Sequence, residues 1–147
     1  MFENLFTYIQ QKYLFLQTQI FFFNMKNEKP KTDILVDVII NSMQEKKGEN
    51  IASLNLQRIQ NAVCDYYIIC HGTSNTQVEA IAESVLEEVK KNTGEIPKSK
   101  EGFQNSEWIL IDFFDVVVHI FQEQTRNFYQ IEKLWADAEI KYFENEN

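Results

Sequence analysis

The chain has 147 residues, 44% of them hydrophobic, which is enough for one domain with a single core and too short for two ordinary domains. Its formal net charge is −8, and residues 101–147 hold −7 of it, with ten Asp and Glu against three Lys and Arg. An acidic C-terminal third argues against nucleic acid as the main direct contact, because phosphate binding needs clustered cations. A basic protein surface is a better match, and the alternative is that these acids only keep the protein in solution.

Residues 1–24 differ from the rest of the chain, with eight of its twenty aromatic residues, one acid and one base. The segment lacks the layout of a signal or transit peptide, and its Gln and Lys residues break any apolar run long enough to span a membrane. We therefore expect residues 1–29 to be an extension, with Met25 as an alternative start, and residues 30–147 to be the functional domain. The alternative is a surface-lying or partner-docking helix, whose face would hold Leu5, Ile9, Leu16, Ile20 and Phe23.

A helix is predicted from Thr32 to Gly48, because apolar residues recur at helical spacing and a glycine follows two lysines. Alternation then predicts a half-buried strand over Glu49–Leu56. A more continuously apolar segment, Asp65–His71, is typical of a central strand. Cys64 and Cys70 fit neither a disulfide framework nor a zinc site, and we expect buried thiols in a reducing compartment.

The strongest helix signal follows Gly72-Thr73-Ser74. Ser74 and Gln77 fit a capping box, and apolar residues continue at helical spacing down to Gly94. A glycine turn at a helix start is also a possible anion cradle, because free N–H groups converge there. A capped helix start is the preferred interpretation.

After a loop over residues 95–107, two apolar runs, Trp108–Ile111 and Val116–Phe121, flank Asp112-Phe113-Phe114-Asp115. The pattern predicts a hairpin of two buried strands with an unusually decorated tip. A stripe of apolar residues then favours one or two helices from about Glu123 to Phe143. The predicted order is helix, strand, strand, helix, strand, strand, helix, which is typical of an α/β domain with a mixed sheet and helices packed on it.

Two kinds of chemistry can be weighed against this pattern. Asp112, Asp115 and His119 are suitable metal ligands, but His119 lies inside an apolar strand, and we expect a buried histidine satisfied by hydrogen bonds. A nucleotidyltransferase would need two acids at alternate positions of a strand to hold magnesium, and neither hairpin strand has that pair. We expect no catalytic residue, no metal and no cofactor, with a metal-dependent nucleotidyltransferase near Ser74 and Asp112 as the alternative.

One ordered set of motifs is more specific than any single element. Its members are Asp65-Tyr66-Tyr67-Ile68-Ile69-Cys70, Gly72-Thr73-Ser74, Ala80-Ile81-Ala82, Glu101-Gly102, Trp108-Ile109-Leu110-Ile111-Asp112, Asp115-Val116-Val117-Val118-His119, Arg126, Tyr129, Leu134-Trp135 and Ala138. In this order the set resembles the ribosomal silencing factor family, also called the RsfS or Iojap family, from about Thr32 to Phe143. Residues 1–24 lie outside the resemblance. At the hairpin tip, Phe114 stands where the family usually has Gly.

The resemblance implies a nucleotidyltransferase-like fold without the catalytic acids and a cytoplasmic, non-enzymatic translational repressor. It implies binding to the large ribosomal subunit through ribosomal protein fourteen, which sterically blocks the small subunit under nutrient limitation, and it implies a homodimer with no membrane contact. An acidic chain with exposed aromatics suits a basic ribosomal partner. The expected contact residues are Trp108, Ile109, Asp112, Phe113 and Asp115, and the expected supporting residues are Glu101, Arg126 and Tyr129. For Trp108 and Tyr129 the alternative is core packing.

Overall fold

The computed structural model describes residues 2–27 and 29–145 and divides into two compact units, one ending at Lys31 and one starting at Thr32. The first unit holds helix α1 (Phe2–Asn27) and the start of α2. The elements of the second unit are α2 (Lys31–Glu45), β1 (Glu49–Asn55), β2 (Tyr66–Gly72), α3 (Asn75–Thr93), β3 (Ser99–Glu101), β4 (Trp108–Asp112), β5 (Val116–Gln122), α4 (Glu123–Tyr129), α5 (Ile131–Leu134) and β6 (Glu139–Phe143).

Helix α1 exposes every side chain that is described within it, from Leu5 to Phe23, including its large apolar ones. Within residues 2–27 and 29–145, none of the helices combines the length and apolar content that crossing a membrane requires. That the functional protein starts at Met25 stays a prediction, which mass spectrometry of the mature N-terminus checks.

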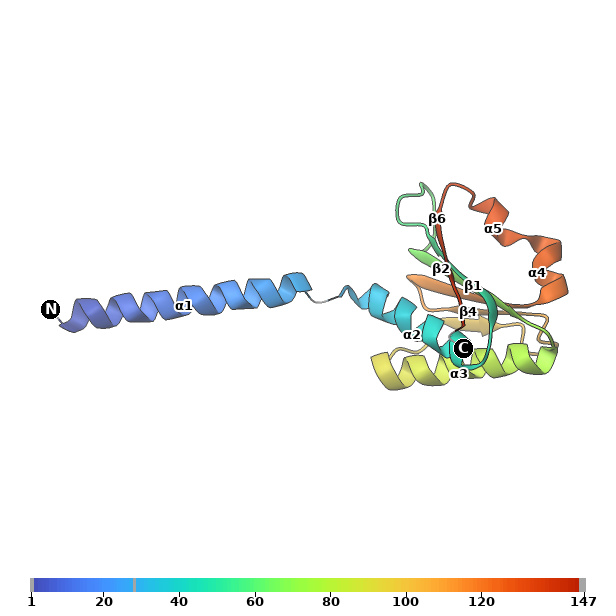
Figure 1. Ribbon diagram of the computed structural model, residues 1–147, viewed down its shortest axis with the longest axis horizontal. Helices are drawn as coiled ribbons and strands as arrows, with labels where there is room; N and C mark the ends of the chain where they lie inside the picture. The colour runs from blue at the N-terminus through green and yellow to red at the C-terminus, as the bar shows by residue number, and fades with distance from the viewer. Residues whose placement is uncertain (1, 28, 146–147) are drawn as a thin grey trace. The chain divides into compact units, whose positions relative to one another are not determined.

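The second unit is a six-stranded mixed sheet in the order β3-β4-β5-β2-β1-β6. Only the central pair β2 and β5 is parallel among the pairings described, so the prediction of a central strand after Asp65 is confirmed. Helices α2 and α3 cover one face of the sheet, and α4 and α5 lie on the other (Figure 1). The α/β architecture predicted from the sequence is therefore confirmed.

Helices α2 and α3 each end close to the glycine predicted from the sequence, although only α3 uses that glycine to turn the chain. After α3, Gly94 has a φ of 74° and donates its N–H to Lys90 O at 3.0 Å, so the predicted glycine cap is confirmed. After α2, the left-handed residue is Lys47, with a φ of 59°, and Gly48 only completes the turn by donating to Met43 O at 2.8 Å.

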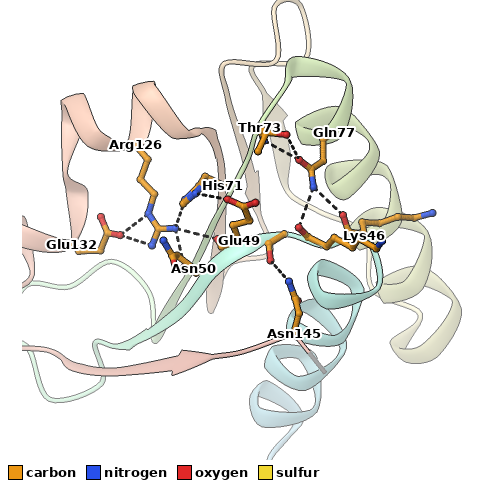
Figure 2. Close-up of polar contacts among 11 residues, drawn as sticks. Lys46, Glu49, Asn50, His71, Thr73, Gln77, Arg126, Glu132 and Asn145 are labelled. Carbon is orange, nitrogen blue, oxygen red and sulfur yellow. Dashed lines mark hydrogen bonds and ion pairs between the residues drawn. The ribbon is translucent and has the colours of Figure 1, made fainter. Parts of the chain in front are cut away.

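The start of α3 is capped by Ser74, whose Oγ accepts the Gln77 N–H at 3.2 Å. The Gln77 side chain does not complete a capping box. Its Oε1 accepts the Thr73 N–H at 2.8 Å, and its Nε2 donates to Lys47 O at 3.0 Å (Figure 2). Gln77 therefore ties the beginning of α3 to the end of α2, and it occupies a donor that an anion cradle would need.

Two predicted boundaries are wrong. The helix expected to run to Phe143 stops at Leu134, and residues 139–143 form strand β6, which pairs antiparallel with β1. In the sequence Glu-Ile-Lys-Tyr-Phe, a short polar–apolar alternation, typical of a strand, competes with the helical spacing of the apolar residues. Pairing with β1 decides the outcome because it satisfies the backbone groups of an otherwise open edge. Within the expected loop 95–107, β3 likewise pairs with the outer edge of β4.

Candidate functional site

The β4–β5 hairpin presents two different faces, because side chains alternate along a strand. Ile109 and Ile111 of β4 point into the core formed with α2 and α3. Trp108 and Leu110 belong to the second face, and by alternation Asp112 follows them. These three side chains are all half-exposed, unlike the fully buried β5 residues beside them. We call Trp108, Leu110 and Asp112 the open face of the hairpin.

Trp108 is held firmly at one end of this open face. Its Nε1–H donates to His119 Nδ1 at 3.1 Å, and its ring centroid lies 4.9 Å from Phe121 and 5.0 Å from Tyr129. Trp108 therefore packs partly against the core and is partly exposed. Tyr129, for which core packing was the alternative, is exposed. A large, half-exposed and immobilised indole has the properties of a binding hot spot.

His119 is almost fully buried beneath Trp108 and the Tyr67 ring, whose centroid lies 4.7 Å from its own. Because Nδ1 accepts the indole hydrogen, a neutral ring carries its own hydrogen on Nε2, and this atom has no hydrogen-bond partner among the described residues. The expected fully satisfied histidine is therefore only half satisfied. Burial lowers the pKa of His119 to about 4, so the ring is neutral at pH 7.

This depressed pKa gives stability a pH dependence of known sign. In the unfolded chain His119 takes up a proton near its ordinary pKa of 6.5, whereas in the folded protein its pKa is about 4. Stability is therefore full above pH 6.5 and falls as the pH drops toward 4, by about 1 kcal/mol per pH unit. Urea unfolding at pH 7, 6 and 5 measures this loss.

The matched variant is His119→Gln, which keeps an acceptor for Trp108 but cannot ionise. Its unfolding free energy should fall less steeply across the same pH range than that of the wild type. Equal slopes for the two proteins would contradict this assignment. His71 remains in both proteins, so its contribution to the pH dependence of stability cancels in the comparison.

The tip of the hairpin is a strained γ-turn centred on Phe114. The Asp115 N–H donates to Phe113 O at 3.0 Å, and Phe114 has a φ of 72°. Asp112 Oδ1 braces the turn by accepting the Phe114 N–H at 2.8 Å. A glycine adopts this positive φ without strain, whereas for a residue with a Cβ that conformation costs about 1–2 kcal/mol.

The structure separates the five expected contact residues. Trp108 and Asp112 lie on the open face, and Asp115 is exposed at the tip. Ile109 is 0% exposed and Phe113 is 3% exposed, so neither side chain reaches the surface. Both pack into the core beneath α2 and α3, Ile109 because of its register in β4 and Phe113 because the turn folds it inward.

The three expected supporting residues also lie in different places. Tyr129 contacts the Trp108 ring as expected. Glu101 reaches β4 through the backbone, paired with Leu110, and its side chain is exposed. Arg126 does not brace the hairpin tip, because it lies beside His71 at the other end of the parallel β2–β5 pair.

Arg126 is instead the centre of a buried polar network (Figure 2). Its guanidinium donates to Glu132 Oε1 through Nε at 2.8 Å and to Asn50 O through Nη1 at 2.8 Å. Nη1 also lies 3.0 Å from His71 Nδ1, and His71 Nε2 lies 3.3 Å from a Glu49 carboxylate oxygen. Burial and the Arg126 charge lower the pKa of His71, which keeps Nδ1 free to accept. The network joins α4 and α5 to the ends of β1 and β2.

The residues proposed for the nucleotidyltransferase alternative are not brought together. Asp112 is opposite Val117, which lies beside Tyr67 at the start of β2. Ser74 follows the opposite end of β2. From Tyr67 to Gly72 the strand advances five residues, or roughly 16 Å at about 3.3 Å per residue, so Ser74 and Asp112 lie at opposite ends of the sheet. No group of three potential metal-binding side chains occurs within the described ranges.

The two cysteines are buried, as predicted, and unpaired. Burial, aided by the charges of Asp112 and Asp65, raises the pKa of Cys64 to about 11. Burial raises the pKa of Cys70 to about 12. Both thiols therefore stay protonated at neutral pH, where a thiol is a poor nucleophile.

The sequence analysis did not assign two residues of this region to the site. Leu110 shares the open face with Trp108, which alternation along β4 could have indicated. Tyr67 of β2 packs against His119 of the adjacent strand β5. Burial, followed by the effects of Cys64 and Asp112, raises the pKa of the Tyr67 hydroxyl. Only the strand order, which no local pattern gives, places Tyr67 next to β5.

Comparisons with known proteins agree with this architecture. Residues 27–147 match the family described as "Ribosomal silencing factor during starvation". The ribosomal silencing factor RsfS of Halalkalibacterium halodurans is 41% identical over 104 residues, covering 71% of this chain and 87% of the relative. A crystal structure from Chromobacterium violaceum superimposes with a TM-score of 0.67 at 32% identity, covering 71% of this chain and 85% of that one.

A more distant relative comes from Mus musculus and is named "Mitochondrial assembly of ribosomal large subunit protein 1". It is 24% identical over 103 residues, which cover 69% of this chain and 45% of the mouse protein. Helix α1 lies almost wholly outside the matched residues 27–147. By the extent of the family match and by its similarity to the bacterial silencing factors, the chain belongs to the ribosomal silencing factor family.

Proposed function

We propose that the protein is a cytoplasmic translational repressor, which binds the large ribosomal subunit through ribosomal protein fourteen and blocks joining of the small subunit under nutrient limitation. The observation that carries this proposal is the family membership of residues 27–147. The names of the bacterial relatives support the silencing role, and the name of the mouse relative supports the large subunit as the place of action.

The open face is the surface that best fits a protein partner of this kind. Trp108 and Leu110 are half-exposed apolar residues on a rigid strand, and Asp112 adds a carboxylate at their end. An aromatic anchor with a charged neighbour is the usual composition of an interface centre and its edge. A ribosomal protein is basic, so the −7 charge of residues 101–147 would also accelerate the encounter.

Reversing the charge of Asp112 tests this placement directly. Asp112→Lys should weaken binding to purified large subunits at least tenfold, because a repulsive cation replaces an attractive anion. Co-sedimentation with the large subunit measures the affinity. Glu87→Lys, an exposed charge reversal on α3 behind the sheet, is the matched control and should bind as the wild type does.

A parallel subunit-joining assay tests the activity itself. Wild-type protein should lower the yield of joined ribosomes from purified subunits, and Asp112→Lys should restore it. Retention of the Asp112→Lys fold is checked by circular dichroism. Subunit joining that is unaffected by the wild-type chain, together with no co-sedimentation, would overturn the proposal.

The homodimer implied by the family resemblance is proposed here as well. Light scattering of the full chain at concentrations on either side of the dissociation constant measures it. A strictly monomeric mass at high micromolar concentration would contradict this part of the proposal without affecting ribosome binding.

A further inference from the structure

Phe114 combines two properties that are hard to reconcile within the chain alone. Its φ of 72° is a strained conformation for a bulky residue. Such strain persists when surrounding structure compensates for it, yet the Phe114 side chain is 64% exposed. The contact described for its ring is the Lys98 ammonium, 5.2 Å from the ring centroid, which leaves most of the ring open.

The turn that carries Phe114 is fixed rather than loose. Asp115 O accepts N–H groups from Asp65 at 2.8 Å and Tyr66 at 3.0 Å, which joins the tip to the loop before β2. Asp115 and Asp65 also line a shallow hollow of about 180 Å³ together with Val63, an apolar residue that is 83% exposed. The ring is thus presented on a support that backbone hydrogen bonds hold in place.

We propose that Phe114 is an aromatic anchor of the partner contact, and that its ring inserts into an apolar recess on a basic protein surface. This inference rests on the proposed function and extends the open face around the hairpin tip. Strain at Phe114 is retained because a glycine, which the turn geometry favours, would have no ring to insert. An aromatic side chain held in one conformation loses little entropy on binding, which is typical of hot-spot residues.

The charge around the ring identifies the chemistry of the partner. Asp112, Asp115 and Asp65 lie at or beside this tip, against the Lys98 ammonium at the ring, so the surface around the tip is net acidic. A second copy of the chain docking tip to tip would bring like charges together, which opposes association. A basic protein provides complementary charge and is the occupant we infer.

The decisive variant is Phe114→Gly, because fold stability and binding should change in opposite directions. Relief of the backbone strain should raise the melting temperature by a few degrees. Loss of the ring should weaken co-sedimentation with purified large subunits about tenfold or more. Phe114→Asn, which also tolerates a positive φ but lacks the ring, should show the same loss of affinity.

Tyr142→Ala removes another exposed aromatic, on the far edge strand β6, and should leave affinity unchanged. Unchanged affinity of Phe114→Gly, with wild type binding, would overturn the anchor and leave the proposed function standing. A lower melting temperature of Phe114→Gly would also overturn it, because the ring would then serve the fold through Lys98. So would loss of self-association with ribosome binding intact. Failure of the wild type itself to bind would remove the proposed function.

Discussion

Arg126→Met is expected to lower the free energy of unfolding by about 2–3 kcal/mol, because it removes the donor from the half-buried carboxylate of Glu132 and from a part-buried backbone carbonyl. Glu132 loses both of its guanidinium contacts, and Asn50 O loses a donor at 2.8 Å. His71 Nδ1 loses its partner as well. Thermal unfolding should show a fall in the melting temperature of about 10 °C or more.

Graded variants separate charge from geometry in this network. Arg126→Lys keeps the charge but loses the planar fork, and it should be intermediate in stability. Arg126→Met combined with Glu132→Leu should recover part of the loss, because no uncompensated charge remains. Arg58→Met, at an exposed arginine, is the control and should stay within about 0.5 kcal/mol of the wild type. A loss below about 1 kcal/mol for Arg126→Met would contradict the role assigned to the network.

The network also explains how the second face of the sheet is completed. Arg126 fixes α4 and, through Glu132, α5, while Tyr129 at the end of α4 contacts Trp108. Arg126 was expected to be a supporting residue of the contact face. Its support runs through α4 to Tyr129 and Trp108, which lie at the same end of the sheet as His71.

The elements predicted most accurately are those whose signals are local. Ser74 and Gly94 bound α3 because a cap residue and a left-handed glycine act on neighbouring backbone groups. The hairpin strands were predictable because their apolar runs are short and separated by a turn. Strand β6 was not, because pairing with a strand more than eighty residues earlier decides its conformation.

The same distinction applies to the candidate site. The residue types at Trp108 and Asp112 marked the hairpin as unusual, but the side on which each residue lies follows from the register of β4. Alternation alone would have assigned Ile109 to the core and Leu110 to the open face. The Arg126–His71 contact could not be inferred, since the two residues are 55 positions apart and meet only through the parallel pairing of β2 and β5.

Gly102→Ala should be more damaging than any ordinary surface substitution, at about 4 kcal/mol or more. Gly102 has a φ of 91°, which residues with a Cβ rarely adopt. A Cβ built there would lie 1.9 Å from Trp108 O and 2.9 Å from Trp108 C. These are backbone atoms of β4, so relief requires moving the strand that carries the open face.

Gly94→Ala is the matched control, because its effect on the free energy of unfolding comes from the positive φ alone, without a clash of the new Cβ. Gly94 also has a positive φ, of 74°, yet a Cβ there would meet no heavy atom within 4 Å. Its expected loss is only the left-handed penalty of about 1–2 kcal/mol. Urea unfolding of the two variants measures the difference, and near-ultraviolet circular dichroism reports whether the Trp108 environment changes in Gly102→Ala alone. Equal losses of unfolding free energy for the two variants would mean that β3 moves away from β4 at little cost. Glu101-Gly102 would then not fix the position of β4.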